Sequence, residues 1–408
     1  MRRVVVTGIG IISPIGNSAA EVLDALKAGR SGIERSEEMV EHGFRSQVAG
    51  TIKIDPAQHI DKRRMRFMGP GAAYAYLAME QAIADSGLTE GEVSHERTGL
   101  IAGSGGPSTS NLFAAGQTVL RTGSPKKIGP LMVPRGMSST VSANLATSFR
   151  IKGINYSITS ACSTSLHCIG SAAEQIQMNK QDVMFAGGGE ELDWTLSALF
   201  DAMGAMSSRF NDEPTRASRA FDRDRDGFVI AAGGAIVVLE ERERALARGA
   251  SIYAEVTGFA ATSDGADMVA PSGEGGERAM KVALATLPQG RQVSYINAHG
   301  TSTPVGDVTE VEAVRRVFGD DHPPISSTKS MTGHSQGATG AQEAIYCLLM
   351  LQDDFIAPSI NVENLDPALR EGEIATRLVE KAGLDTVMTN SFGFGGTNGS
   401  MLLSKHLD

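Results

Sequence analysis

Apolar and polar residues alternate with a period of two at several points of the chain, and each such run predicts a β-strand. One run contains Ile154, Tyr156 and Ile158, with a polar residue between each pair. A turn of small residues follows, and apolar positions then recur at helical spacing between Leu166 and Ile176. The pattern predicts a strand, a tight turn and a helix.

The second half of the chain repeats this order. Residues 293–297 alternate as a strand and lead into a polar turn that contains His299. Residues 325–328 lead through Lys329 and His334 into a helix rich in small residues. In both halves, reactive side chains come just after a strand. This similarity predicts an internal duplication.

The boundary between the halves is predicted from the residues that separate them. A charged helix is expected at 240–248, and a new strand begins near Ile252. We place the division at Gly249, which gives a first domain at residues 1–249 and a second at residues 250–408.

Two fragments of known motifs are incomplete. Gly8 and Gly10 follow an opening strand without the third glycine of a dinucleotide-binding turn, so we predict a plain tight turn. Asp222, Asp224 and Asp226 imitate the start of a calcium-binding loop, but its closing glutamate is missing. We interpret this segment as a charged loop that leads into a hairpin and could border an active site.

A short strand at 183–185 is followed by three glycines at 187–189 and by Glu190 and Glu191. The glycines predict the close passage of another backbone. The two glutamates have no local pattern of their own, so they are interpreted as part of a solvated loop.

Composition limits the classes of protein that fit. The 408 residues are 41% hydrophobic and 21% charged, as in ordinary globular proteins of two or three domain-sized units. A net charge of −10 argues against general nucleic-acid binding. Three scattered cysteines cannot form a disulfide framework, and the chain lacks the ~18 consecutive apolar residues of a membrane span. We expect a cytoplasmic protein.

Cys162 is the first candidate for chemistry, because it stands between the predicted turn and the predicted helix. A thiol at a helix N-terminus faces unpaired backbone N–H groups and the positive end of the helix dipole. Both favour the thiolate, which is the nucleophilic form. The alternative is a small buried apolar residue, the usual role of a free cysteine.

Cys162, His299, Lys329 and His334 all lie at or just beyond the end of a predicted strand, where α/β folds gather their functional groups. A zinc site built from the cysteine and the two histidines is a competing interpretation. Zinc ligands usually include a closely spaced pair, and these three are far apart in the sequence. We therefore expect no metal.

The chain resembles the β-ketoacyl-[acyl-carrier-protein] synthases, most closely the type I enzymes of bacterial fatty-acid synthesis, over essentially its whole length. The resemblance rests on four motifs, at residues 160–165, 297–303, 329–334 and 390–397. It implies a thiolase-like α/β fold, with two duplicated halves in a five-layer α-β-α-β-α arrangement, and a homodimer.

The resemblance also implies an activity, the decarboxylative condensation of an enzyme-bound acyl group with malonyl carrier protein. Cys162 would carry the acyl group, and the backbone N–H groups of Cys162 and Phe394 would form the oxyanion hole. His299 and His334 would hydrogen-bond the malonyl thioester carbonyl, and Lys329 would order the histidines. No cofactor is implied, because the substrates arrive on the phosphopantetheine of acyl carrier protein.

Further roles come from the same resemblance. Glu310 and Glu343 would be ionic supports of the site, and Phe394 would gate the acyl pocket. The residues implied to contact substrate are Thr301, Thr303, Phe200, Phe392 and Gly106.

Two basic clusters gain meaning if the partner is an acidic carrier protein. Lys62, Arg63 and Arg66 form the better candidate docking patch, and Lys126 and Lys127 form the second. Without such a partner, each would be an ordinary solvated surface.

Two alternatives remain. A type II elongating synthase shares every catalytic residue, although the glycine and glutamate run at 187–191 favours type I. A non-catalytic partner subunit would bind carrier protein without chemistry. Relatives of that kind lose the nucleophile, and Cys162 is present.

Overall fold

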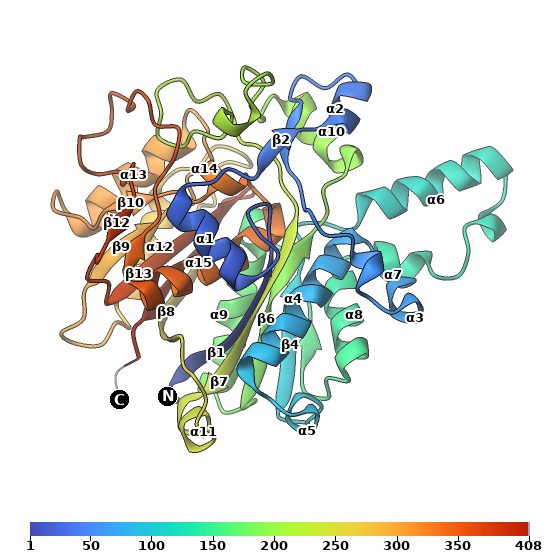
Figure 1. Ribbon diagram of the computed structural model, residues 1–408, viewed down its shortest axis with the longest axis horizontal. Coiled ribbons are helices and arrows are strands. Elements are labelled where there is room, and N and C mark those ends of the chain that lie inside the picture. The colour runs from blue at the N-terminus through green and yellow to red at the C-terminus, as the bar shows by residue number, and fades with distance from the viewer. Residues whose placement is uncertain (407–408) are drawn as a thin grey trace.

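Ten strands form the framework of the protein, and hydrogen bonds join them into one continuous sheet made of two five-stranded halves (Figure 1). The computed structural model describes residues 1–406. The first half has the order β5-β4-β6-β7-β1, and the second has the order β10-β9-β13-β14-β8. The strands of the first half are β1 (Val4–Ile12), β4 (Thr98–Gly103), β5 (Asn155–Tyr156), β6 (Val183–Glu190) and β7 (Gly233–Glu241). Those of the second half are β8 (Ala254–Ser263), β9 (Val293–Asn297), β10 (Ile325–Ser326), β13 (Thr386–Gly393) and β14 (Thr397–Ser404).

The two halves repeat one topology. In each, the first strand pairs antiparallel with the last, the last pairs antiparallel with the fourth, and the second lies parallel between the fourth and the third. This repeat agrees with the predicted internal duplication. Gly249 lies between α11 (Arg242–Ala247) and β8. The division of the chain into two domains at that residue stays a prediction.

Helices fill a central layer and two outer layers. In the centre, α9 (Thr164–Gln177) contacts strands of both halves, and every residue of α15 (Thr339–Asp353) from Thr339 to Leu351 is buried. A helix without a polar face is expected where both of its sides are covered. The outer helices α4 (Pro70–Ser86) and α8 (Thr140–Phe149) cover the first half-sheet, and α12 (Glu274–Leu284) and α13 (Gly306–Phe318) lie on the side of the second (Figure 1). The arrangement has the five layers that the resemblance implies.

The remaining elements surround this core. The helix α6 (Thr109–Thr122), which has no buried residue, extends with the 3₁₀-helix η2 (Pro125–Lys127) away from the body of the molecule (Figure 1). Among residues 1–406, no helix combines the length and the apolar character that crossing a bilayer requires. The other helices and strands are α1 (Ala19–Ala28), α2 (Glu37–Glu41), α3 (Lys62–Met65), α5 (Glu90–Val93), α7 (Met132–Gly136), α10 (Trp194–Met203), α14 (Lys329–Thr332), the 3₁₀-helices η1 (Pro56–Gln58), η3 (Ala161–Ser163), η4 (Pro214–Arg216) and η5 (Gln336–Ala338), and the strand pairs β2 (Ile33–Arg35) with β3 (Val48–Gly50) and β11 (Phe355–Ile356) with β12 (Val379–Glu380).

The predicted turn at Gly8 and Gly10 is wrong, because β1 continues through both glycines to Ile12. A Cβ atom at Gly10 would lie 1.8 Å from the backbone oxygen of Ala78, in α4. One at Gly8 would lie 2.6 Å from the oxygen of Ala82. The glycines therefore serve the close packing of α4 on β1 and do not turn the chain.

The glycine clusters of β6 and β7 also lie inside strands. Residues 187–189 belong to β6, and Gly189 pairs with Gly234 of β7. The hairpin predicted after the charged loop is wrong, because β7 begins at Gly233, runs unbroken to Glu241 and pairs with β1 and β6 on its two sides. Close backbone approach explains the glycines here as well: a Cβ at Gly187 would lie 2.0 Å from the oxygen of Ala235.

The packing of α4 on β1 predicts a large effect from one methyl group. Gly10→Ala should lower the free energy of unfolding by about 2–3 kcal/mol, because the backbone of α4 must move to admit the new Cβ. Gly91→Ala is the control, since a Cβ there has no atom within 4 Å. Denaturant unfolding checks both variants. Equal stability of Gly10→Ala and the wild type would contradict this account of the packing.

Candidate active site

Cys162 lies in η3, and α9 begins two residues later. The strand predicted before it is reduced to the two residues of β5, whereas the predicted helix is present as α9. Ala161 has a φ of +49°, a left-handed conformation that is rare for a residue with a side chain. Strain of this kind is found at functional sites, where the surrounding structure enforces it.

The fold brings the cysteine and the two histidines together. The Sγ atom of Cys162 and one ring nitrogen each of His299 and His334 lie within 4.8 Å of one another. His299 follows β9, and His334 follows α14. The two imidazole rings meet edge to face, with their centroids 5.4 Å apart. The first half of the chain thus supplies the thiol, and the second half supplies both imidazoles.

These three side chains lie close enough together to hold a metal ion, so their separation in the sequence does not by itself exclude zinc. The electrostatics provide a stronger argument against it. The Lys329 ammonium lowers the pKa of both His299 and His334, which places a positive charge beside them. A divalent cation would have to bind next to that charge. The absence of a metal stays a prediction.

Both histidines are neutral in this environment. Burial lowers the pKa of His299 and of His334 well below its usual value, and the Lys329 ammonium lowers it further. Within residues 1–406, His299 Nδ1 and His334 Nε2 have no hydrogen-bond partner, whereas His334 Nδ1 lies 3.0 Å from Thr339 Oγ1. Each ring therefore keeps one nitrogen free for a substrate.

Burial decides the protonation state of Cys162. It raises the pKa of the thiol to about 12, although the Lys329 ammonium and the backbone N–H groups of Phe394 and Cys162 act in the opposite direction. The Glu190 carboxylate raises that pKa as well. The backbone N–H groups thus favour the thiolate, but in the free protein desolvation outweighs their effect.

Lys329 and Glu343 form a buried ion pair, with Nζ and Oε1 2.5 Å apart and each side chain only 1% exposed. Burial raises the pKa of Glu343 to about 7, against the opposing effect of Lys329. The pair fixes an ammonium whose charge acts on both histidines. Glu343 is thus placed as the resemblance implied, next to Lys329.

Glu310 contacts the backbone that carries His299, and the Lys329 ammonium acts on its carboxylate as well by lowering its pKa against the effect of burial. Glu310 accepts hydrogen bonds from the backbone N–H groups of His299 and Gly300, both at 2.9 Å, and from the Asn390 amide at 3.2 Å. The residues described include no ion pair between Glu310 and Lys329 within 4.0 Å. Glu310 therefore fixes the backbone of the turn that carries His299.

The solvated loop predicted at Glu190 and Glu191 is wrong. Glu190 is 2% exposed and accepts hydrogen bonds from Ser104 Oγ, from the Gly105 N–H, both at 2.7 Å, and from the Gly337 N–H at 3.0 Å. Burial raises its pKa to about 7. No local pattern reveals this role, because all three donors are distant in the sequence. The preceding glycines were the only signal of a crowded interior.

A cavity of about 460 Å³ opens beside the thiol. The sequence-predicted residues that line it are Cys162, Phe200, His299, Thr301, Thr303, Glu310, His334, Phe392 and Phe394. Gly106 does not line this cavity, so its predicted contact with substrate stays a prediction. Gln336 is a lining residue that the sequence analysis missed.

Phe394 occupies the turn between β13 and β14. Its ring centroid lies 6.3 Å from that of Phe200, which lines the same cavity. The following glycines are tied to a neighbouring loop, since the Gly395 N–H donates to the Met268 oxygen and the Asp264 N–H donates to the Gly396 oxygen. Hydrogen bonds therefore join the turn that carries Phe394 to the loop at residues 264–268.

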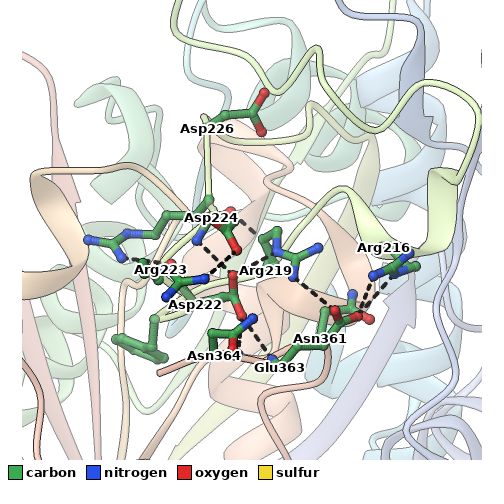
Figure 2. Close-up of polar contacts among 12 residues, drawn as sticks. Arg216, Arg219, Asp222, Arg223, Asp224, Asp226, Asn361, Glu363 and Asn364 are labelled. Atoms are coloured by element: carbon green, nitrogen blue, oxygen red, sulfur yellow. Dashed lines mark hydrogen bonds and ion pairs between the residues drawn. The ribbon is translucent and has the colours of Figure 1, made fainter. Parts of the chain in front are cut away.

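The charged loop at 222–226 borders the cavity through Asp226. Asp222 accepts hydrogen bonds from Arg219 and from the backbone N–H groups of Glu363 and Asn364, whereas Asp226 points away from Asp222 and Asp224 (Figure 2). The three carboxylates do not converge. The geometry therefore agrees with the rejection of a calcium loop.

The predicted docking residues are all exposed. Lys62 and Arg63 lie on α3, and Arg66 follows that helix with its guanidinium 4.8 Å from the Phe67 ring centroid. Lys126 and Lys127 lie on η2, in the segment that extends from the body (Figure 1). The two clusters are available to a partner.

The chain matches two family models along most of its length. Residues 1–245 match "Beta-ketoacyl synthase, N-terminal domain", and residues 253–363 match "Beta-ketoacyl synthase, C-terminal domain". Among curated proteins, the chain is 61% identical over 406 residues to 3-oxoacyl-[acyl-carrier-protein] synthase 1 of Haemophilus influenzae, with 100% of both chains covered. It is 42% identical over 412 residues to synthase 2 of Vibrio cholerae, with 99% of each covered.

Solved structures agree. A β-ketoacyl synthase from Burkholderia phymatum is 37% identical, covers 100% of both chains and has a TM-score of 0.93. A ketosynthase solved in complex with a type II PKS acyl-carrier protein is 28% identical, again with 100% of both chains covered, and has a TM-score of 0.88. This chain belongs to the β-ketoacyl synthase family.

Proposed function

We propose that this chain is a 3-oxoacyl-[acyl-carrier-protein] synthase, which condenses an enzyme-bound acyl group with malonyl carrier protein. One observation carries the proposal: the Cys162 thiol and two neutral imidazoles meet within 4.8 Å at the head of a largely apolar cavity. A nucleophile that holds an acyl group and two donors for one oxygen are the groups this reaction needs.

In the first step, the Cys162 sulfur attacks the thioester carbonyl of an acyl carrier protein. A C–S bond forms to Cys162, the bond to the carrier's sulfur breaks, and the proton of Cys162 ends on the departing carrier thiol. The N–H groups of Cys162 and Phe394, which already point at the sulfur region, stabilise the oxyanion of the tetrahedral intermediate.

In the second step, malonyl carrier protein enters and loses CO₂. The electron pair of the broken C–C bond moves into an enolate, whose negative charge develops on the thioester oxygen. His299 and His334 donate hydrogen bonds to that oxygen. Because both rings are neutral, each donates without losing its proton, and the bonds strengthen as the charge grows.

In the third step, the enolate carbon attacks the acyl-Cys162 carbonyl. A C–C bond forms, the Cys162 thiolate leaves and takes up a proton from solvent, and the product is a β-ketoacyl carrier protein two carbons longer. The buried Lys329 ammonium, whose charge acts on both histidines, also stabilises the negative charge of the enolate. Its partner Glu343 holds the Lys329 side chain in place through the buried ion pair.

The partner protein is proposed from charge and from a structural neighbour. The exposed cations Lys62, Arg63 and Arg66 would attract an acidic carrier protein, with Lys126 and Lys127 as a second contact. A family neighbour has been solved with its acyl-carrier protein, which supports this class of partner. Thr301 and Thr303 line the cavity and would contact the phosphopantetheine arm.

Several properties follow from the same proposal. The enzyme needs no cofactor of its own, because the carrier's arm delivers both substrates. We also propose a homodimer, as in the family, and a cytoplasmic location, which fits three free cysteines. Identity of 61% to a synthase 1 against 42% to a synthase 2 favours the type I activity over type II.

Acylation is the first property to test. Mixing the protein with an acyl carrier protein should add the mass of one acyl group, and Cys162→Ala should add none. Cys168→Ala is the matched control, because Cys168 is a buried free thiol on α9, outside the cavity lining. Intact-mass spectrometry measures all three. Absence of an adduct on the folded wild type would favour the non-catalytic partner subunit.

The buried ion pair predicts different effects on stability and activity. Glu343→Leu leaves the Lys329 ammonium unpaired and should lower the free energy of unfolding by about 3–5 kcal/mol. The double variant Lys329→Met/Glu343→Leu should regain most of that stability and still fail to release CO₂ from malonyl carrier protein. Denaturant unfolding and a CO₂-release assay check this. Decarboxylation by the double variant would limit Lys329 to a structural role.

The docking patch predicts a salt-dependent effect on carrier use. Reversing the charges of Lys62, Arg63 and Arg66 to Glu should raise KM for the acyl carrier protein by about tenfold or more at low salt, with kcat unchanged. The difference should shrink as salt rises. Lys180→Glu, an exposed position near the far end of α9, is the control. Equal KM values at low salt would place the docking site elsewhere.

A further inference from the structure

Gln336 combines three properties that are unusual together. It opens η5, two residues after His334, with a φ of +47° in the left-handed region. Its side chain is polar, yet the residue is only 6% exposed. It lines the same cavity as Cys162 and the two histidines. A strained, buried amide at a reactive site needs a physical reason.

The hydrogen bonds of this amide lead to Cys162. The thiol donates to Gln336 Oε1 across 3.8 Å, which is a hydrogen bond to a carbonyl oxygen. Within residues 1–406, Gln336 Nε2 has no partner, although it is buried. An unmade hydrogen bond of a buried N–H donor costs about 1–3 kcal/mol. Because Nε2 has no partner, a rotation that exchanges the positions of Oε1 and Nε2 breaks only the hydrogen bond from the thiol.

The two ends of an amide suit two states of the sulfur. A carbonyl oxygen accepts from the S–H of a thiol, and an N–H group donates to a thiolate. Hydrogen bonds to an ionised acceptor are about twice as strong as neutral ones. An amide that can present either end therefore stabilises the thiolate more than the thiol.

We propose that Gln336 is a further catalytic residue, which rotates its amide and donates Nε2–H to the Cys162 sulfur as the thiol loses its proton. The proposal deepens the proposed function and rests on Cys162 as its nucleophile. During acylation, the S–H bond of Cys162 breaks, its electron pair forms the C–S bond to the acyl group, and the proton ends on the departing carrier thiol. The donated hydrogen bond lowers the cost of the transient thiolate.

The backbone of Gln336 is held in place from outside the cavity. The next residue, Gly337, donates its N–H to Glu190 Oε2 at 3.0 Å. A Cβ at Gly337 would lie 2.1 Å from the backbone nitrogen of Gly105, so η5 packs directly against the end of β4. Glu190 thus joins the two segments and keeps the strained turn beside the thiol.

Lys329 on α14 and Glu190 on β6 also act on the thiol, and the imidazoles of His299 and His334 lie beside it. All of them stay in place when only Gln336 is changed. Gln336→Met is therefore a suitable test, since methionine keeps the length and flexibility of glutamine and removes both polar ends.

Two measurements test the proposal on the intact protein without any carrier protein. The first is the ultraviolet absorbance of the Cys162 thiolate along a pH series, taken as the difference from Cys162→Ala. The second is the rate of Cys162 alkylation by iodoacetamide, followed by peptide mass spectrometry. We expect Gln336→Met to raise the thiol pKa by about one unit, which makes alkylation about tenfold slower at a given pH. Gln352→Met, an exposed glutamine at the end of α15, should leave both unchanged.

The outcomes separate the possible roles. A thiolate titration of Gln336→Met that coincides with the wild type would overturn the proposal, even if alkylation slowed, because slower alkylation alone would indicate altered access. A titration shifted to lower pH would also overturn it. Thermal unfolding shows whether the variant is folded, and Gln336→Leu provides a second apolar variant. A failed acyl transfer by the wild type would count against the proposed function alone, because the titration needs no substrate.

Discussion

The buried charge of Lys329 is the interaction on which the site depends. An ammonium in a water-excluded interior is costly, and its ion pair with Glu343 offsets that cost. Once held there, the charge adds to the effect of burial in lowering the pKa of His299 and His334, and it opposes the effect of burial on the pKa of the Cys162 thiol. Removing the charge would take away an electrostatic effect that reaches the thiol and both imidazoles.

The duplicated scaffold explains why these groups meet. Each half contributes one central helix, and η3 before α9 and η5 before α15 face each other at the cavity. Cys162 stands on the first of these turns, and Gln336 stands on the second. Both turns contain a residue with positive φ, Ala161 and Gln336, so the backbone is strained on both sides of the sulfur. Small side chains and glycines make this close approach possible, as at Gly337 and Gly105.

Much of the fold and the central residues could be predicted from the sequence, because they depend on local patterns. Alternation and helical spacing identified β9 and α9, and the position after a strand identified Cys162 and His299. Glu190 could not be identified, since its burial depends on donors about 85 and 147 residues away. The role of Gly10 was equally hidden, because only the packed position of α4 shows why a side chain cannot fit there.

The site also resolves a conflict between binding and reactivity. A cavity that accepts an acyl chain must be apolar, and the same apolar burial raises the pKa of Cys162 to about 12. A thiol held in this way is a poor nucleophile but is also protected from stray electrophiles and oxidants, which react with thiolates. The groups that favour the thiolate are backbone N–H groups, a buried ammonium and an amide with an unused donor. Because these groups are fixed around the position of the thioester, they stabilise negative charge most when a substrate fills the cavity, so that reactivity is coupled to occupancy.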